Sequence, residues 1–170
     1  MKNTKRLLTW ILVAVLVVST VALAACVDKP KTVVLSKLSL PEMDDDQMVI
    51  IIKNRDGTFT AHIVTLGGSG TDATTVEGVI SYLVGLDKLT VDWTDSEETG
   101  KWLNDIGGLK PNADAHEYVS VYTSVQKDWG VGASSTAYKI DDITVGYSQY
   151  GVSGMSVQAG AVIYFELQTW

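Results

Sequence analysis

The stretch M-V-I-I-I-K-N-R-D-G-T-F-T-A-H-I-V-T, residues 48–65, decides the fold class. It opens with a continuous apolar, β-branched run of the length of one strand. Asp56-Gly57 follows and supplies the positive φ that a tight turn requires, and after the turn apolar and polar residues alternate. The stretch therefore predicts a β-hairpin, with His62 on the polar, solvated face of the second strand.

An amphipathic helix is predicted after the hairpin, beyond the glycine-rich connector at residues 67–70. Thr74 and Glu77 have the spacing of a capping box, in which two side chains satisfy free backbone N–H groups at a helix start. Apolar residues then recur at helical spacing, and Gly85 is a natural C-terminal stop. These apolar residues are Val76, Val79, Ile80 and Leu83.

Further strands are predicted over residues 89–93, 117–125 and 161–168, with a glycine turn at residues 106–109. The order of two strands, one helix and more strands places a single helix across one mixed sheet. We therefore expect an α+β fold over residues 48–170, a β-grasp-like mixed sheet with one main helix.

The first 25 residues have the three parts of an export signal. A basic start at Lys2, Lys5 and Arg6 precedes an apolar stretch over residues 7–18 and a group of small residues. A transmembrane helix is the alternative, because residues 7–25 are almost long enough to span a bilayer. The small residues before Cys26 favour a cleaved signal peptide, residues 1–25.

Leu23-Ala24-Ala25-Cys26 resembles the bacterial lipobox. The resemblance implies that Cys26 begins the mature lipoprotein and carries fatty acyl chains such as palmitate. This lipid anchor would hold the protein on the extracytoplasmic face of the cell membrane, at the cell surface. A free catalytic or structural thiol is the alternative. Since Cys26 is the only cysteine, no disulfide is expected in the mature domain.

Residues 26–47 are predicted to form a lipidated, flexible tether. Pro30, Pro41 and the acidic run at residues 44–46 interrupt any sustained period, although residues 33–35 could form a short edge strand. The acidic run lacks the spacing and the closing Glu of a calcium-binding loop.

Charge excludes one class of partner. The chain has 13 Lys+Arg against 20 Asp+Glu, a net charge of −7, and loss of the three cationic residues in the leader gives 10 against 20, or −10. Such an acidic surface repels phosphate backbones, so no nucleic-acid partner is expected.

The sequence offers little for catalysis. Its two histidines, His62 and His116, have no cysteine partner and no metal-protease or serine-hydrolase motif around them. Acidic pairs at residues 97–98 and 141–142 could serve a glycosidase, but neighbours in sequence need not face each other across a cleft. We therefore expect no enzymatic activity, no metal site and no resident cofactor.

The segment 127–154 interleaves glycine and serine with aromatic residues. Rigid rings beside small, adaptable residues are typical of binding loops. The segment is therefore the predicted recognition surface, and the alternative is a β-hairpin with tyrosines packed at the sheet edge. The candidate ligand-binding residues are Trp129, Tyr138, Tyr147 and Tyr150.

Several motifs together resemble the transcobalamin C-terminal-like family, a β-grasp-type module of bacterial surface proteins and lipoproteins. They are the capped helix, the turn at residues 106–109, the strand Y-V-S-V-Y at residues 118–122, and the closing stretch G-V-S-G-M-S-V-Q-A-G-A-V-I-Y-F at residues 151–165. The resemblance covers residues 48–170, with departures from the family pattern at residues 121–124 and 158–161. In vertebrate vitamin carriers this module is the smaller half of a clamp around cobalamin.

We therefore expect a membrane-anchored extracytoplasmic binding lipoprotein. The resemblance implies that its ligand is a corrinoid such as cobalamin, or another small molecule. The alternative is a structural or adhesive surface module that recognises a protein or glycan partner by its sheet edge and the segment 127–154.

Overall fold

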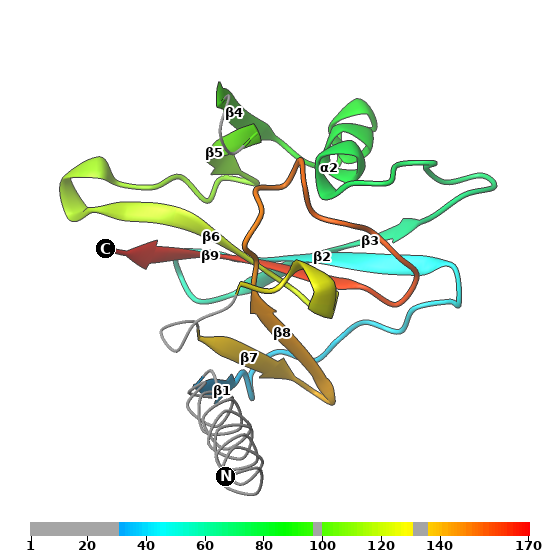
Figure 1. Cartoon of the computed structure of the whole chain (residues 1–170), viewed down its shortest axis with the longest axis horizontal. Helices are drawn as coiled ribbons and strands as arrows, with labels where there is room; N and C mark the ends of the chain where they lie inside the picture. The colour runs from blue at the N-terminus through cyan, green and yellow to red at the C-terminus, as the bar shows by residue number, and fades with distance from the viewer. Residues whose placement is uncertain (1–30, 97–99, 131–135) are drawn as a thin grey trace, which may run out of the picture.

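The computed structural model describes residues 31–96, 100–130 and 136–170 (Figure 1). The predicted signal peptide, residues 1–25, and Cys26 lie outside the described residues. The described part is a mixed α+β fold with one α-helix and a large mixed sheet, as predicted.

The elements follow one another from the N-terminus to the C-terminus as nine strands, one α-helix and two short 3-10 turns in the described ranges. They are β1 (Thr32–Val34), β2 (Gln47–Lys53), β3 (Phe59–Thr65), α2 (Val76–Gly85), β4 (Val91–Ser96), β5 (Gly100–Ile106), η1 (Ala113–Ala115), β6 (Glu117–Thr123), η2 (Gln126–Asp128), β7 (Ala137–Ile140), β8 (Ile143–Tyr147) and β9 (Val162–Thr169).

Seven of the strands form one sheet in the order β1-β7-β8-β6-β9-β2-β3, and β4 and β5 form a separate hairpin. The strand pairs β2–β9 and β1–β7 are parallel, and the other neighbours are antiparallel. The first strand of the predicted hairpin, β2, and the C-terminal strand, β9, therefore lie side by side inside the sheet, one strand in from the edge strand β3.

The hairpin at residues 48–65 is confirmed: β2 and β3 pair over seven residues, and Gly57 has φ of 83° in the turn. The prediction for His62 is wrong, because its side chain is half-buried on the same face of β3 as the buried Val64. Burial, and next the charge of Lys88, lower the pKa of His62 below its ordinary value.

The helix is confirmed, and its four predicted apolar residues are all buried. Its cap differs by one residue: Thr75 rather than Thr74 is the N-cap, and its hydroxyl accepts a hydrogen bond from the N–H of Gly78. The predicted stop also differs. Gly85 is still helical, and it is Asp87, with φ of 54°, that takes the left-handed conformation after the helix.

The large sheet separates two hydrophobic cores (Figure 1). One core lies beneath α2 and contains the helix's apolar residues and alternate residues of β2 and β9. The other contains the intervening residues of β2 and β9 and is closed by β7, β8 and the chain around β1. Because β2 is buried on both faces, its sequence is a continuous apolar run and does not alternate.

Residues 31–47 pack against the sheet through some of their apolar side chains, so the predicted flexible tether is wrong for this part of the chain. These side chains are Val33, Leu35, Leu38, Leu40 and Met43. Strand β1 pairs with β7, which confirms the short edge strand, and the N–H of Leu35 donates to the carbonyl of Lys139. Leu38 is buried in the second core. These residues pack because they cover apolar side chains of the second core that would otherwise face solvent.

Candidate functional site

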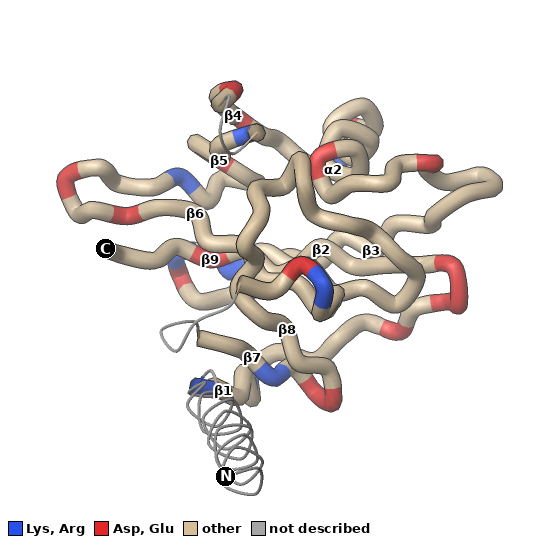
Figure 2. Tube along the Cα trace, in the orientation of Figure 1, with Lys and Arg blue, Asp and Glu red and all other residues tan. Residues whose placement is uncertain are grey.

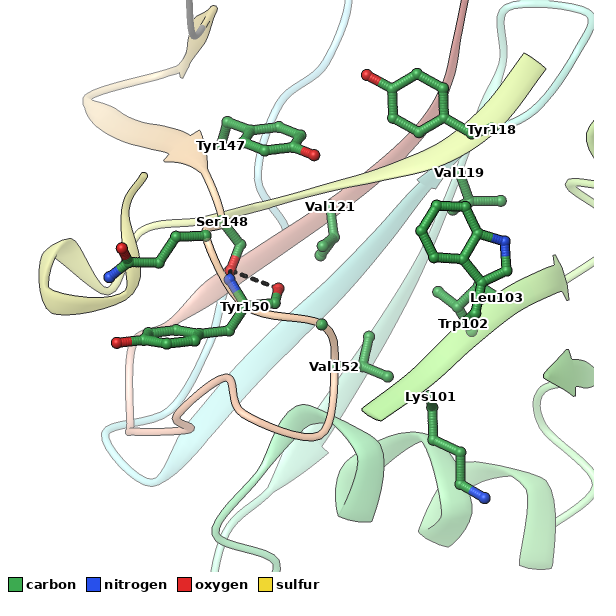
Figure 3. A pocket seen from close by; sticks show the side chains of 12 residues that line it. Lys101, Trp102, Leu103, Tyr118, Val119, Val121, Tyr147, Ser148, Tyr150 and Val152 are labelled. Carbon is green, nitrogen blue, oxygen red and sulfur yellow. Dashed lines mark hydrogen bonds between the residues drawn. The ribbon is translucent and has the colours of Figure 1, made fainter. Parts of the chain in front are cut away.

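A groove lies where β5 and β6 approach the chain that leaves β8, and its volume is about 210 Å³ (Figure 3). Its apolar lining consists of Leu103, Val119, Val121 and Val152. These residues border the core beneath α2, so the groove is an opening at the margin of that core. It is an open hollow between three segments that lie far apart in the sequence.

Three aromatic side chains surround the groove (Figure 3). Trp102 comes from β5, Tyr118 from β6 and Tyr147 from the end of β8. Trp102 is 52% exposed, which is unusual for so large an apolar ring. Burial, and next the nearby Tyr118, raise the pKa of Tyr147, so its hydroxyl stays protonated at neutral pH.

The groove carries little available charge. Among the described residues that line the groove, Lys101 is the one with a charged side chain. The ammonium of Lys101 pairs with Asp95 and lies 5.4 Å from the ring centre of Trp93. Ser148 is also engaged, because its hydroxyl donates to the carbonyl of Tyr150 and accepts from that residue's N–H. The remaining surface suits an uncharged ring that stacks or packs edge-on against aromatic walls.

Two of the four predicted ligand-binding residues lie at this groove. Tyr147 contributes a wall, and Tyr150 lines the rim, where it is 46% exposed. Figure 3 shows the ring of Tyr150 directed away from Trp102 and Tyr118. Both tyrosines therefore lie at the groove, and their role in ligand binding stays a prediction.

Trp129 does not reach the groove. Its indole Nε1 donates to the carbonyl of Thr123 at 2.6 Å, and its ring lies against the backbone of Gly146, where a Cβ would be 2.5 Å from the ring. Trp129 therefore holds η2 onto the ends of β6 and β8.

Tyr138 lies in the second core, only 9% exposed, and its hydroxyl donates to the carboxylate of Glu166. Its place on β7 corresponds to the alternative interpretation of this segment, a hairpin with packed tyrosines. Tyr138 is therefore a core residue and not part of the groove.

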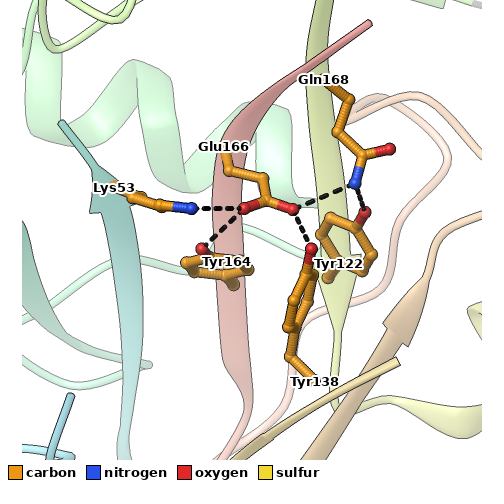
Figure 4. Close-up of polar contacts among 6 residues, drawn as sticks. All are labelled: Lys53, Tyr122, Tyr138, Tyr164, Glu166 and Gln168. Carbon is orange, nitrogen blue, oxygen red and sulfur yellow. Dashed lines mark hydrogen bonds and ion pairs between the residues drawn. The ribbon is translucent and has the colours of Figure 1, made fainter. Parts of the chain in front are cut away.

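A polar network surrounds Glu166, whose side chain is buried in the second core (Figure 4). The carboxylate accepts hydrogen bonds from the hydroxyls of Tyr138 and Tyr164, from the amide of Gln168, and from the ammonium of Lys53 at 3.2 Å. A buried carboxylate is costly unless such donors replace water. The network therefore makes burial of Glu166 tolerable and joins β2, β7 and β9.

The tyrosines of this network remain hydroxyl donors over the ordinary pH range. Burial first, and next the bond to Glu166, raise the pKa of Tyr138 to about 12. Burial is also the main cause of raised pKa values at Tyr122 and Tyr164.

Gln168 connects this network to the groove. Its amide nitrogen donates to the hydroxyl of Tyr122 at 2.6 Å, and its carbonyl accepts a longer hydrogen bond, 3.4 Å, from Tyr118. The ring of Tyr122 also contacts Tyr147 edge-on, with ring centres 5.7 Å apart. Two walls of the groove thus rest on the buried network.

Trp102 and Tyr118 were not predicted from the sequence. Tyr118 belongs to a strongly alternating strand, which makes it look like a sheet residue, and Trp102 lies on β5, for which no strand was predicted. A solvent-facing tryptophan between Lys101 and Leu103 has no distinctive local pattern.

The described residues contain no group of three or more His, Cys, Asp or Glu side chains that could hold a metal ion. In the same ranges no helix has the length and apolar character needed to cross a membrane. Lys and Arg positions are dispersed along the described part of the Cα trace (Figure 2).

No family model and no curated protein matches this chain. Among solved structures it is similar to a crystal structure of a "putative metal binding protein" from Ruminococcus gnavus ATCC 29149. The TM-score is 0.49 with 10% sequence identity, and the match covers 74% of this chain and 98% of the other. A likeness at that level carries no argument about function.

Proposed function

We propose that this protein is a lipid-anchored, extracytoplasmic binding module without enzymatic activity, and that its groove binds a neutral, ring-bearing ligand. The observation that carries the proposal is the convergence of Trp102, Tyr118 and Tyr147 on one apolar hollow. Rings exposed together at a concave site offer large contact area at low entropic cost. The acyl anchor is proposed from the lipobox-like sequence that ends at Cys26.

The size of the groove limits how it would engage a ligand. At about 210 Å³ it is smaller than the roughly 300–1,000 Å³ typical of pockets that enclose drug-sized molecules. A corrinoid would therefore present one edge or one substituent to the groove and leave the rest for another surface.

The connectivity of the sheet supports a β-grasp-type module of the transcobalamin C-terminal-like kind. Strands β3-β2-β9-β6 are consecutive in the sheet, with the parallel pair β2–β9 at their centre and α2 connecting the first hairpin to the later strands. This arrangement is the one expected for a hairpin, a crossing helix and a final central strand.

The test is calorimetric titration of the full-length protein in detergent micelles with cobinamide, cobalamin, cellobiose and the uncharged N-acetyltryptophanamide. We expect at least one ligand to bind and Trp102→Ala to weaken it by about 2 kcal/mol, the cost of losing a binding anchor. Leu86→Ala is the control, because Leu86 is 46% exposed and lies outside the groove lining. Equal losses in both variants would remove the groove as the site.

A further inference from the structure

Strand β6 is paired along its whole length on one side and over two residues on the other. It pairs with β9 from Glu117 to Thr123, but with β8 only at Tyr122 and Thr123. After Tyr147 the chain leaves β8 and turns away along the rim of the groove. The stretch of β6 before Val121 therefore has an edge that faces the groove.

The hydrogen bonds of β6 show which backbone groups point to that edge. The carbonyls of Val121 and Thr123 accept from the N–H of Ser148 and from the Trp129 indole, on the β8 side. The N–H of Ser124 donates to Val162 on the β9 side. Because backbone groups alternate in direction along an antiparallel strand, Val119 directs its N–H and C=O toward the groove.

No strand pairs with Val119 on that side in the ranges that the structure describes. Its neighbour in the same direction, Glu117, donates its N–H to Asn112. The N–H and the C=O of Val119 are thus a donor and an acceptor that no other strand uses in the described ranges. They lie in the groove next to its three aromatic walls. An unpaired strand edge is a template for another strand.

We propose that the ring-bearing ligand is a short extended segment of a partner protein, which adds to the β6 edge and pairs with Val119. Strand addition of this kind draws affinity from backbone bonds and specificity from pockets for alternate side chains. Here an aromatic or aliphatic side chain of the segment would enter the space between Trp102, Tyr118 and Tyr147. This inference rests on the proposed function and names its ligand class.

The groove favours an uncharged segment. Lys101 is already paired with Asp95, so it offers little to an acidic segment, and the chain's net charge of −7 repels one. Sugars and corrinoids carry rings, but they lack the regular alternation of N–H and C=O that a strand edge matches.

The premise is tested by hydrogen exchange on the ¹⁵N-labelled full-length protein in detergent micelles. We expect the amide of Val119 to exchange at least tenfold faster than the amides of Tyr118 and Ser120, which face β9. Equal protection of the three amides would overturn the inference.

The pairing is tested with the peptide acetyl-Thr-Val-Trp-Val-Thr-amide. We expect it to shift and protect the Val119 amide, and we expect N-methylation of one alternate set of its amides to weaken binding at least tenfold. Methylation of the other set, which points away from β6, should change binding less than twofold. Equal effects of the two analogues, or no effect of the peptide on Val119, would overturn the inference.

The two proposals fail in different ways. If cobinamide or cellobiose binds in a manner that depends on Trp102 while the peptide leaves Val119 unchanged, the binding function stands and strand addition falls. If no ligand in either set depends on Trp102, both fall.

Discussion

At the scale of single residues, aromatic side chains that look alike in the sequence have different roles in the structure. Trp129 and Tyr147 both lie in the segment 127–154, yet Trp129 is bonded to the carbonyl of Thr123 and Tyr147 lines the groove. The difference depends on residues more than five positions away. The composition of the segment 127–154 therefore indicated some residues that line the groove. It could not distinguish them from packed residues such as Trp129.

Replacing Trp129 by Ala should destabilise the protein. The change removes the packing against Gly146 and the bond to Thr123, and truncation of a packed tryptophan costs about 3 kcal/mol. The measurement is urea unfolding. Trp102→Ala should shift the unfolding free energy by only about 0.5 kcal/mol, as expected of an exposed side chain; equal losses would contradict these assignments.

His62 should make stability depend on pH. Because its pKa is lowered in the folded state, the unfolded chain binds a proton at higher pH than the folded chain does. Stability is then fully present above the unfolded value of about 6.5 and decreases as the pH falls from there to the lower folded pKa. Urea unfolding between pH 7.5 and 5 should show this decrease.

The matched variant is His62→Asn, which removes the titrating ring. We expect the decrease of stability over that pH range to become smaller than in the wild type. An unchanged decrease would show that other groups cause it.

At the scale of elements, the predictions succeeded where one segment carries its own pattern. The hairpin β2–β3 and the helix α2 have strong local periodicity and a local turn or cap, and both are confirmed. Strand β5 was not predicted, and the hairpin β7–β8 was only the alternative interpretation of the segment 127–154, because glycine and polar residues weaken the alternation of these strands. Residues 31–47 were misjudged because β1 pairs with β7, about 100 residues later in the chain.

Replacing Glu166 by Ala should loosen the elements that the network joins. The hydroxyls of Tyr138 and Tyr164 would lose their acceptor inside the second core, at a cost of about 3 kcal/mol. Guanidinium unfolding measures it. Lys53→Met is the control and should cost about 1 kcal/mol or less, because the Lys53 side chain is 40% exposed. A larger loss for Lys53→Met than for Glu166→Ala would contradict this account.

At the scale of the whole molecule, the folded unit is larger than the predicted domain 48–170. The second core is closed by β1 and by Leu38, which is buried, so residues 31–47 belong to the fold. The function expected from the sequence rests on a resemblance carried by short motifs. Such motifs do not indicate how residues 31–47 pack against the rest of the molecule.

A chain that begins at residue 48 should therefore be much less stable than one that begins at residue 31. Removal of residues 31–47 exposes apolar residues of β7 and β8 and leaves β7 without its partner strand. Thermal melting of the two chains compares them, and we expect the shorter chain to melt at a temperature more than about 10 °C lower. Equal melting temperatures would instead support the prediction that these residues form a flexible tether.

The early start of β1 also determines how far an anchored protein could act. Only six positions separate Cys26 from Thr32, where the sheet begins, and even a fully extended chain of that length spans about 20 Å. With Cys26 acylated, the domain would be confined to a thin layer above its own bilayer. It would meet partners that share its membrane or are carried to it, and it could not reach across a wide envelope to an opposing surface.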